Sequence, residues 1–139
     1  MNGPKSAGDR KLTGVWQGLY SYPRQAPDVP FTATLFEAGS SLSGPILEPC
    51  LMGGAPGEIL YATLLGSRDG STVNFVKSYD GSNPNYRSVQ YAGSVNHDAT
   101  EIEGRWSIPG IWSGRFLMMR SGNAPAEQVQ RKEVEETVK

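Results

Sequence analysis

Several residue types that would narrow the function are scarce in this sequence. It holds a single cysteine, Cys50, and a single histidine, His97. One cysteine cannot form an intrachain disulfide, and one histidine with one cysteine supplies no metal-ligand set of the usual spacing. We therefore expect no disulfide framework, no metal site and no cofactor.

Long apolar runs and an excess of one charge are also missing. No apolar run approaches the roughly 20 residues needed to cross a bilayer, and residues 1–5 lack the apolar stretch of a signal peptide. The net charge is -1, with 13 basic and 14 acidic residues, which disfavours a polyanionic partner. We expect a soluble protein of the reducing cytoplasm that binds neither nucleic acid nor membrane.

Glycine and proline, by contrast, are frequent, with 17 and 10 occurrences. They separate short runs of β-branched and aromatic residues, a pattern typical of all-β sandwiches and barrels. A chain of 139 residues is long enough for one domain with one core. The predicted fold is all-β, a single up-and-down antiparallel β-barrel of about eight strands, over residues 13–22, 30–38, 41–48, 57–66, 71–80, 86–96, 99–108 and 111–120.

The predicted barrel domain covers residues 12–120. Residues 1–11 are expected to be a disordered N-terminal arm. Residues 121–139 form a charged C-terminal tail, with Val129, Val134 and Val138 at imperfect helical spacing. This tail is expected to be disordered or a short helix, and a helix could dock on the barrel or on a partner.

Alternation within the strands predicts which side chains face inward, because successive residues of a strand point to opposite faces. In residues 102–108 the charged residues share one parity, and in residues 112–120 Ser113 and Arg115 mark the outside. The inward set predicted from these strands and from residues 89–95 is Val89, Tyr91, Gly93, Val95, Ile102, Gly104, Trp106, Ile108, Trp112, Gly114, Phe116, Met118 and Arg120.

Three residues carry a family resemblance. Gly14 and Trp16 form a Gly-x-Trp motif on the first strand, and Arg120 ends the last strand. This combination resembles the calycin superfamily of lipocalins, avidins and fatty-acid-binding proteins. Residues 41–44, Ser-Leu-Ser-Gly, also look like the third strand of avidins. The resemblance implies that Trp16 closes one end of the barrel and that Arg120 packs across it, as structural residues together with Gly14.

The sequence departs from the family in two places. The first strand continues as Gln17-Gly18-Leu19-Tyr20 without the polar asparagine of the avidin biotin site. The Thr-Asp-Tyr motif of lipocalins is also missing, and Ser78-Tyr79-Asp80 does not reproduce it. Biotin binding is therefore not implied.

Connection lengths predict which end of the barrel is open. In an up-and-down barrel the connections alternate between the two ends. Those over 23–29, 49–56, 81–85 and 109–110 are on average longer and richer in proline than those over 39–40, 67–70 and 96–98. Trp16 and Arg120 belong to the end with the tight turns, so the mouth is predicted at the other end.

The candidate ligand site consists of residues that parity turns inward near this mouth. An aromatic wall with a few polar groups is typical of small-molecule sites. Two alternatives stay open: Lys77 could snorkel to the rim, and Glu48 could lie outside if Pro45 and Pro49 break the alternation. The candidate ligand-binding residues are Tyr20, Tyr22, Phe31, Glu48, Lys77, Tyr79, Tyr91, Trp106 and Trp112.

Two further residues are weaker candidates. His97 lies in a predicted tight turn far from the mouth and is expected to be solvated. Cys50 lies in an apolar, glycine-containing loop at the mouth, which could be a flap over the pocket or a contact with a second subunit. A thiol nucleophile would need a histidine base close by, which the sequence does not place there.

Three functions are compatible with these residues. The first is a binding protein for a small apolar or aromatic ligand, or one that bears a carboxylate, with Lys77 as its anchor and the tyrosines as walls and donors. The second is a cofactor-free isomerase, cyclase or hydratase, with Glu48 as base and Lys77 or Tyr79 as acid or oxyanion donor. The third is a structural or interaction protein with a filled barrel. Association into a homo-oligomer is possible in each case.

Overall fold

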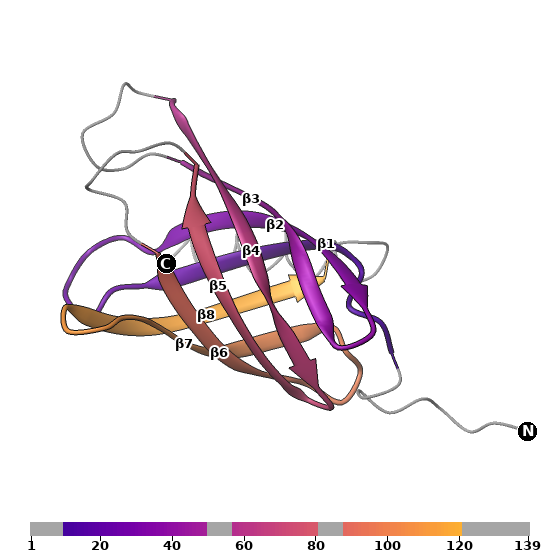
Figure 1. The fold of residues 1–139 in the computed structure, drawn as a ribbon. Coiled ribbons are helices and arrows are strands. Elements are labelled where there is room, and N and C mark those ends of the chain that lie inside the picture. Colours follow the sequence, from indigo (N-terminus) through magenta and orange to yellow (C-terminus); the bar gives the residue numbers. More distant parts are fainter. Residues whose placement is uncertain (1–9, 50–56, 81–87, 121–139) are drawn as a thin grey trace, which may run out of the picture.

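The structure, a computed structural model, describes residues 10–49, 57–80 and 88–120. Each strand pairs antiparallel with the next, and β8 also pairs with β1, so the sheet closes on itself (Figure 1). This confirms the predicted all-β, up-and-down barrel. The strands are β1 (Gly14–Ser21), β2 (Val29–Ala38), β3 (Ser41–Pro49), β4 (Ile59–Asp69), β5 (Thr72–Tyr79), β6 (Val89–Val95), β7 (Glu101–Ile108) and β8 (Trp112–Arg120).

Several predictions concern residues outside these ranges. The predicted connections over 49–56, with Cys50, and 81–85, the tail over 121–139 and the predicted arm lie wholly or mostly outside the described residues. Within the described ranges, no helix is long and apolar enough to cross a membrane.

The end of β4 differs from the prediction for an identifiable reason. We expected a turn over residues 67–70, but β4 continues to Asp69, which pairs with Thr72. The turn is therefore only Gly70 and Ser71, and Gly70 adopts a φ of 61°, which favours glycine. In a sequence, a charged residue next to a turn signal is typical of a loop. In the structure, however, Arg68 is buried on the inner face of the strand.

The predicted alternation of faces is confirmed along the wall. The buried core includes Trp106, Phe116 and Met118, together with Val89 and Tyr91 of β6. Close approach of the strands is possible where inward positions lack a side chain. Gly93 lies opposite Gly104, and a Cβ added to Gly104 would overlap a backbone carbonyl of β6.

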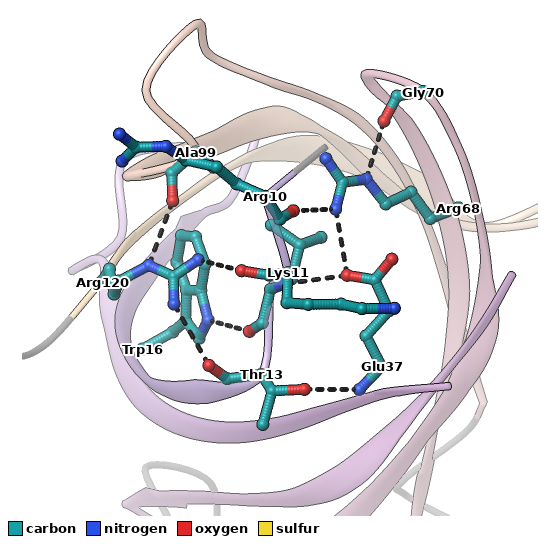
Figure 2. A network of polar contacts seen from close by, with 10 residues as sticks. Arg10, Lys11, Thr13, Trp16, Glu37, Arg68, Gly70, Ala99 and Arg120 are labelled. Atoms are coloured by element: carbon teal, nitrogen blue, oxygen red, sulfur yellow. Dashed lines mark hydrogen bonds and ion pairs between the residues drawn. The ribbon is translucent and has the colours of Figure 1, made fainter. Parts of the chain in front are cut away.

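One end of the barrel, which we call the closed end, is covered by an aromatic plug (Figure 2). Trp16 is fully buried, and its indole N–H donates to the carbonyl oxygen of Leu12 at 2.9 Å. The Arg120 guanidinium lies 4.8 Å from the centre of the Trp16 ring. It also donates to the carbonyl oxygens of Lys11, Thr13 and Ala99, at 2.6, 3.1 and 3.1 Å. Cation–π attraction and charged hydrogen bonds thus attach the segment before β1 to the end of β8.

A second group at the closed end was not predicted from the sequence. Arg68 forms a buried ion pair with Glu37, with 3.0 Å between Nη1 and Oε1. Arg68 also donates to the carbonyl oxygens of Arg10 and Gly70, and the same Glu37 oxygen accepts from the backbone N–H of Leu12 (Figure 2). Arg10 and Lys11, placed in the arm by the sequence analysis, are therefore held against the barrel. Burial lowers the pKa of Arg120, helped by the charges of Arg10 and Arg68.

Candidate functional site

The candidate site lies inside the barrel, toward the end opposite the Trp16 plug, which we call the mouth end. Its centre is an ion pair between Glu48 on β3 and Lys77 on β5, with 2.8 Å between Oε1 and Nζ. Glu48 is 3% exposed and Lys77 is 2% exposed. The two side chains belong to strands on either side of β4, and between their partners Leu60 and Leu64 the inward residue of β4 is the small Ala62.

Both open alternatives about these charges are therefore wrong. Lys77 does not snorkel to the rim, because Glu48 neutralises it inside the barrel. Glu48 does not face outward, because the prolines leave the register of β3 intact. Pairing with β4 runs without a break from Ser41 to Pro49, and the β2 pairs on either side of Pro45 keep one register. A proline removes a ladder hydrogen bond without shifting the faces.

Two tyrosine hydroxyls complete the hydrogen bonding of the carboxylate. Tyr20 donates to Oε2 of Glu48 at 2.6 Å, and Tyr79 donates to Oε1 at 3.0 Å. Oε1 also accepts from Lys77. Both carboxylate oxygens therefore have donors, as a buried charge requires.

The Lys77 ammonium is surrounded by aromatic rings on its remaining sides. Its Nζ atom lies 4.6 Å from the ring centre of Tyr20, 4.7 Å from that of Tyr79 and 5.5 Å from that of Tyr91. The faces of these rings attract a desolvated cation. The group is thus a cation enclosed by aromatic rings and paired with one carboxylate, with no net charge when both are ionised.

Burial perturbs the acidities of this group. Desolvation lowers the pKa of Lys77, and the negative charge of Glu48 opposes this shift. Desolvation followed by the charge of Glu48 raises the pKa values of Tyr20 and Tyr79. Desolvation also raises the pKa of Tyr91. The three tyrosines therefore stay protonated at neutral pH, and Tyr20 and Tyr79 donate to Glu48.

An aromatic cluster lies at the mouth end, next to Tyr20. Tyr22 contacts Trp112 with 4.9 Å between ring centres and meets Trp106 edge-on at 5.7 Å. Tyr20 also meets Trp106 edge-on, at 6.0 Å. Tyr22 and Trp112 are only partly buried, whereas Trp106 is buried and its indole N–H donates to the carbonyl oxygen of Ser21. Arg24, in the β1–β2 connection, lies over the Trp112 ring at 5.9 Å.

The remaining predicted site residues lie deeper in the core. Phe31 packs over Gly18, where an added Cβ would overlap its ring, and Tyr91 stacks on Phe75 with 4.8 Å between centres. The structure therefore brings Tyr20, Glu48, Lys77, Tyr79 and Tyr91 into one group, with Tyr22, Trp106 and Trp112 above it. Gly14, Trp16 and Arg120 lie at the closed end instead.

Two closed-end residues could have been found from a signal in the sequence. Arg68 shares the parity of the buried residues Ala62 and Leu64, and Glu37 shares that of Ala33 and Leu35.

His97 is exposed in its turn, as expected. Across the described ranges, no three residues among histidine, cysteine, aspartate and glutamate are grouped to hold a metal ion.

Comparison of the chain with models of protein families found no match, and a search of curated proteins found none either. The barrel is consistent with a calycin-like fold in general. The argument for function therefore depends on the geometry of this site.

Proposed function

We propose that the protein binds a small, flat and predominantly apolar molecule at the mouth end of the barrel. In this proposal Tyr22, Tyr79 and Trp112 contact the ligand, and the Glu48–Lys77 pair lies beneath them. These three aromatic side chains pack against the core but keep part of their surface exposed.

The observation that carries the proposal is the buried ion pair, which Tyr20 links to a partly exposed aromatic cluster. Desolvation of two charges costs several kcal/mol per ion, and well-packed apolar residues would fill a barrel at equal or better stability. The Arg68–Glu37 pair holds the segment before β1, whereas the hydrogen bonds of Glu48 and Lys77 described above join only side chains of strand residues. Groups of this kind in an aromatic surrounding are typical of binding sites, where a few polar groups orient the ligand.

The charge of the group indicates the class of ligand. Lys77 is neutralised by Glu48 and is not accessible, so it offers no free charge to a carboxylate. The Tyr79 hydroxyl, on a partly exposed ring, can exchange its bond to Glu48 for a bond to a ligand. An uncharged aromatic molecule with a hydrogen-bond acceptor, such as a carbonyl or ether oxygen, fits these groups best.

Catalysis by the same residues is less favoured. Glu48 and Lys77 converge, as an acid–base mechanism needs. However, Glu48 is only 3% exposed and already accepts three hydrogen bonds, so a substrate would reach the carboxylate only by displacing these donors. Binding requires only the displacement of Tyr79, whereas catalysis would require breaking up the buried pair.

A fluorescence titration with N-phenyl-1-naphthylamine, a neutral flat aromatic probe, tests the proposal. We expect saturable binding that Trp112→Ala weakens at least tenfold, because the ring at the rim of the site is removed. Phe36→Ala is the matched control, since Phe36 is an exposed aromatic on the outer wall. Its affinity should equal that of the unmodified protein.

Native mass spectrometry of protein purified from its own cells gives an independent readout. A retained small molecule, absent from the Trp112→Ala variant, would support the proposal. No probe binding together with a bare chain mass would contradict it and favour the filled barrel. Equal loss of affinity in Trp112→Ala and Phe36→Ala would also contradict it.

A further inference from the structure

The outer wall of the barrel carries a hollow that is separate from the candidate site. Its volume is about 490 Å³, within the range of small-molecule sites. It extends across β4 to β8, of which β4 and β5 cross the front of the barrel in Figure 1. Its lining residues are Leu65, Gly66, Asn74, Phe75, Val76, Gln90, Tyr91, Ala92, Arg105, Trp106, Ser107 and Ser113.

The hollow exists because small and large side chains alternate on this face. Phe75, Tyr91 and Trp106 point into the core, so they leave mainly backbone to the outer surface. The outward side chains of Ala92, Ser107 and Ser113 are short, while Leu65 and Val76 stand at one side and Arg105 at the other. Leu65 is 61% exposed and Val76 is 38% exposed. The hollow thus has an apolar side and a cationic side.

The cationic side contains an unfavourable pairing. Arg105 on β7 lies directly opposite Arg115 on β8, and both are exposed. Like charges directly opposite each other destabilise an antiparallel pair. Among the residues that the structure describes, no acceptor is hydrogen-bonded to either guanidinium. Glu103 shares this face, but it lies on the side away from Ser107 and Ser113 and forms no ion pair with a described residue.

We propose that this hollow binds a small amphipathic carboxylate, with the acidic group on Arg105 and the apolar body on Leu65 and Val76. An anion between Arg105 and Arg115 would relieve their repulsion. Ser107 and Ser113 add hydroxyl donors beside it. Arg105 is two strands from Val76 and three from Leu65, which corresponds to about 10 to 14 Å, so a chain of medium length spans the hollow.

This site differs in chemistry from the mouth-end site. The Glu48–Lys77 group carries no net charge and is enclosed by aromatic rings. The hollow instead has an aliphatic side and a cation, Arg105, that forms no ion pair with a described residue. The barrel wall separates them, since Trp106 presents its ring to one and its backbone to the other. The two proposals can therefore fail independently.

Isothermal titration of the full chain with decanoate, below its micellar concentration and at pH 8, tests the inference. We expect binding of one decanoate per chain. Arg105→Gln should weaken it at least tenfold, because a charged hydrogen bond and the ionic attraction are lost. Ala92→Phe should abolish it by filling the hollow. Decyltrimethylammonium, with the same chain length and the opposite charge, should not bind.

Two controls share the features of these variants without touching the hollow. Ser94→Phe introduces the same ring at the next outward position of β6, and Lys11→Gln removes an exposed cation at the closed end. Both should bind decanoate like the unmodified protein. Because Ala92 and Ser94 are both exposed strand positions, thermal denaturation should give similar melting temperatures for the two phenylalanine variants.

The remaining outcomes overturn the inference. If Trp112→Ala abolishes decanoate binding while Ala92→Phe does not, the carboxylate binds in the mouth. If decanoate and decyltrimethylammonium bind equally well, Arg105 does not select the ligand. Absence of decanoate binding, or equal effects of Ala92→Phe and Ser94→Phe, would rule out the hollow as a site for such ligands.

Discussion

The two ends of this barrel use the same chemistry in different ways. Each contains a buried ion pair, Arg68–Glu37 at the closed end and Lys77–Glu48 toward the mouth, and each holds a cation against an aromatic ring. At the closed end the cations donate mainly to backbone carbonyls. Toward the mouth, the hydrogen bonds of Glu48 and Lys77 described above all involve side chains.

This difference separates a structural group from an adaptable one. At the closed end each arginine donates to two or three backbone carbonyls at once, so its side chain rotates away only if several bonds break together. A bond to a tyrosine hydroxyl is lost when one side chain rotates. The mouth-end group can therefore exchange a partner for a ligand, and the closed end cannot. The following predictions test that distinction.

The largest effect is expected when the mouth-end pair is broken on one side. Lys77→Met leaves the Glu48 carboxylate buried without its cation and should lower the free energy of unfolding by about 3 to 5 kcal/mol. The double variant Glu48→Gln, Lys77→Met should be more stable than the single variant, because no charge remains unpaired. Urea unfolding measures both. Additive losses in the double variant would contradict the pairing.

A smaller loss of folding stability is expected when Arg120 at the closed end is replaced. Arg120→Met removes a cation–π contact and three hydrogen bonds to carbonyls, and should lower the free energy of unfolding by about 2 to 3 kcal/mol. The loss should be accompanied by faster hydrogen exchange at Leu12 and Thr13. Binding of N-phenyl-1-naphthylamine should not change. A change in probe affinity without faster exchange would show that the two ends are not separate in function.

The smallest change in the free energy of unfolding per titrating side chain is expected from a change of pH. Folding raises the pKa values of Tyr20, Tyr79 and Tyr91. The stability that these side chains contribute is therefore fully present below the unfolded pKa of about 10, and it is lost as the pH rises above that value. Each contributes a slope of about 1.4 kcal/mol per pH unit. The lowered pKa of Lys77 acts in the opposite direction, since stability from this residue rises with pH up to about 10.5.

Unfolding curves between pH 8 and pH 11.5 check this balance. Stability should fall steeply above about pH 10.5, and Tyr79→Phe should reduce that slope by about one third, because one of three groups is removed. Tyr61→Phe is the control, since Tyr61 is exposed on the outer wall. Equal slopes for the unmodified protein and Tyr79→Phe would mean that Tyr79 ionises as freely in the folded state as in the unfolded one.

Much of the fold was predictable because the signals that define it are local. Glycine and proline mark the turns, and alternation assigns side chains such as Phe75, Trp106 and Phe116 to the inside without knowledge of the partner strand. The exception is Arg68, whose charge beside Asp69 and Gly70 is typical of a turn. Its burial depends on Glu37, which lies 31 residues away in the chain.

The candidate site was predictable as a set of residues but not as a set of contacts. The alternation of side chains along the strands predicted that Glu48, Lys77 and Tyr79 face inward. It could not show that both oxygens of Glu48 would be occupied or that Lys77 would be inaccessible, which moved the proposed ligand from a carboxylate to a neutral molecule. The outer hollow had no signal of its own, because it depends on how side chains of five strands line up.

The amino-acid sequence by itself determined most of the strands and their inner and outer faces, because the period of two can be read from consecutive residues. The meeting of Trp16 and Arg120 was implied by the family resemblance. Only the tertiary structure decided that Glu48 meets Lys77 across β4, that Arg68 meets Glu37, and that Arg105 faces Arg115. Such meetings depend on register between strands, and a slip of one residue would turn a strand's whole set of side chains to the other face.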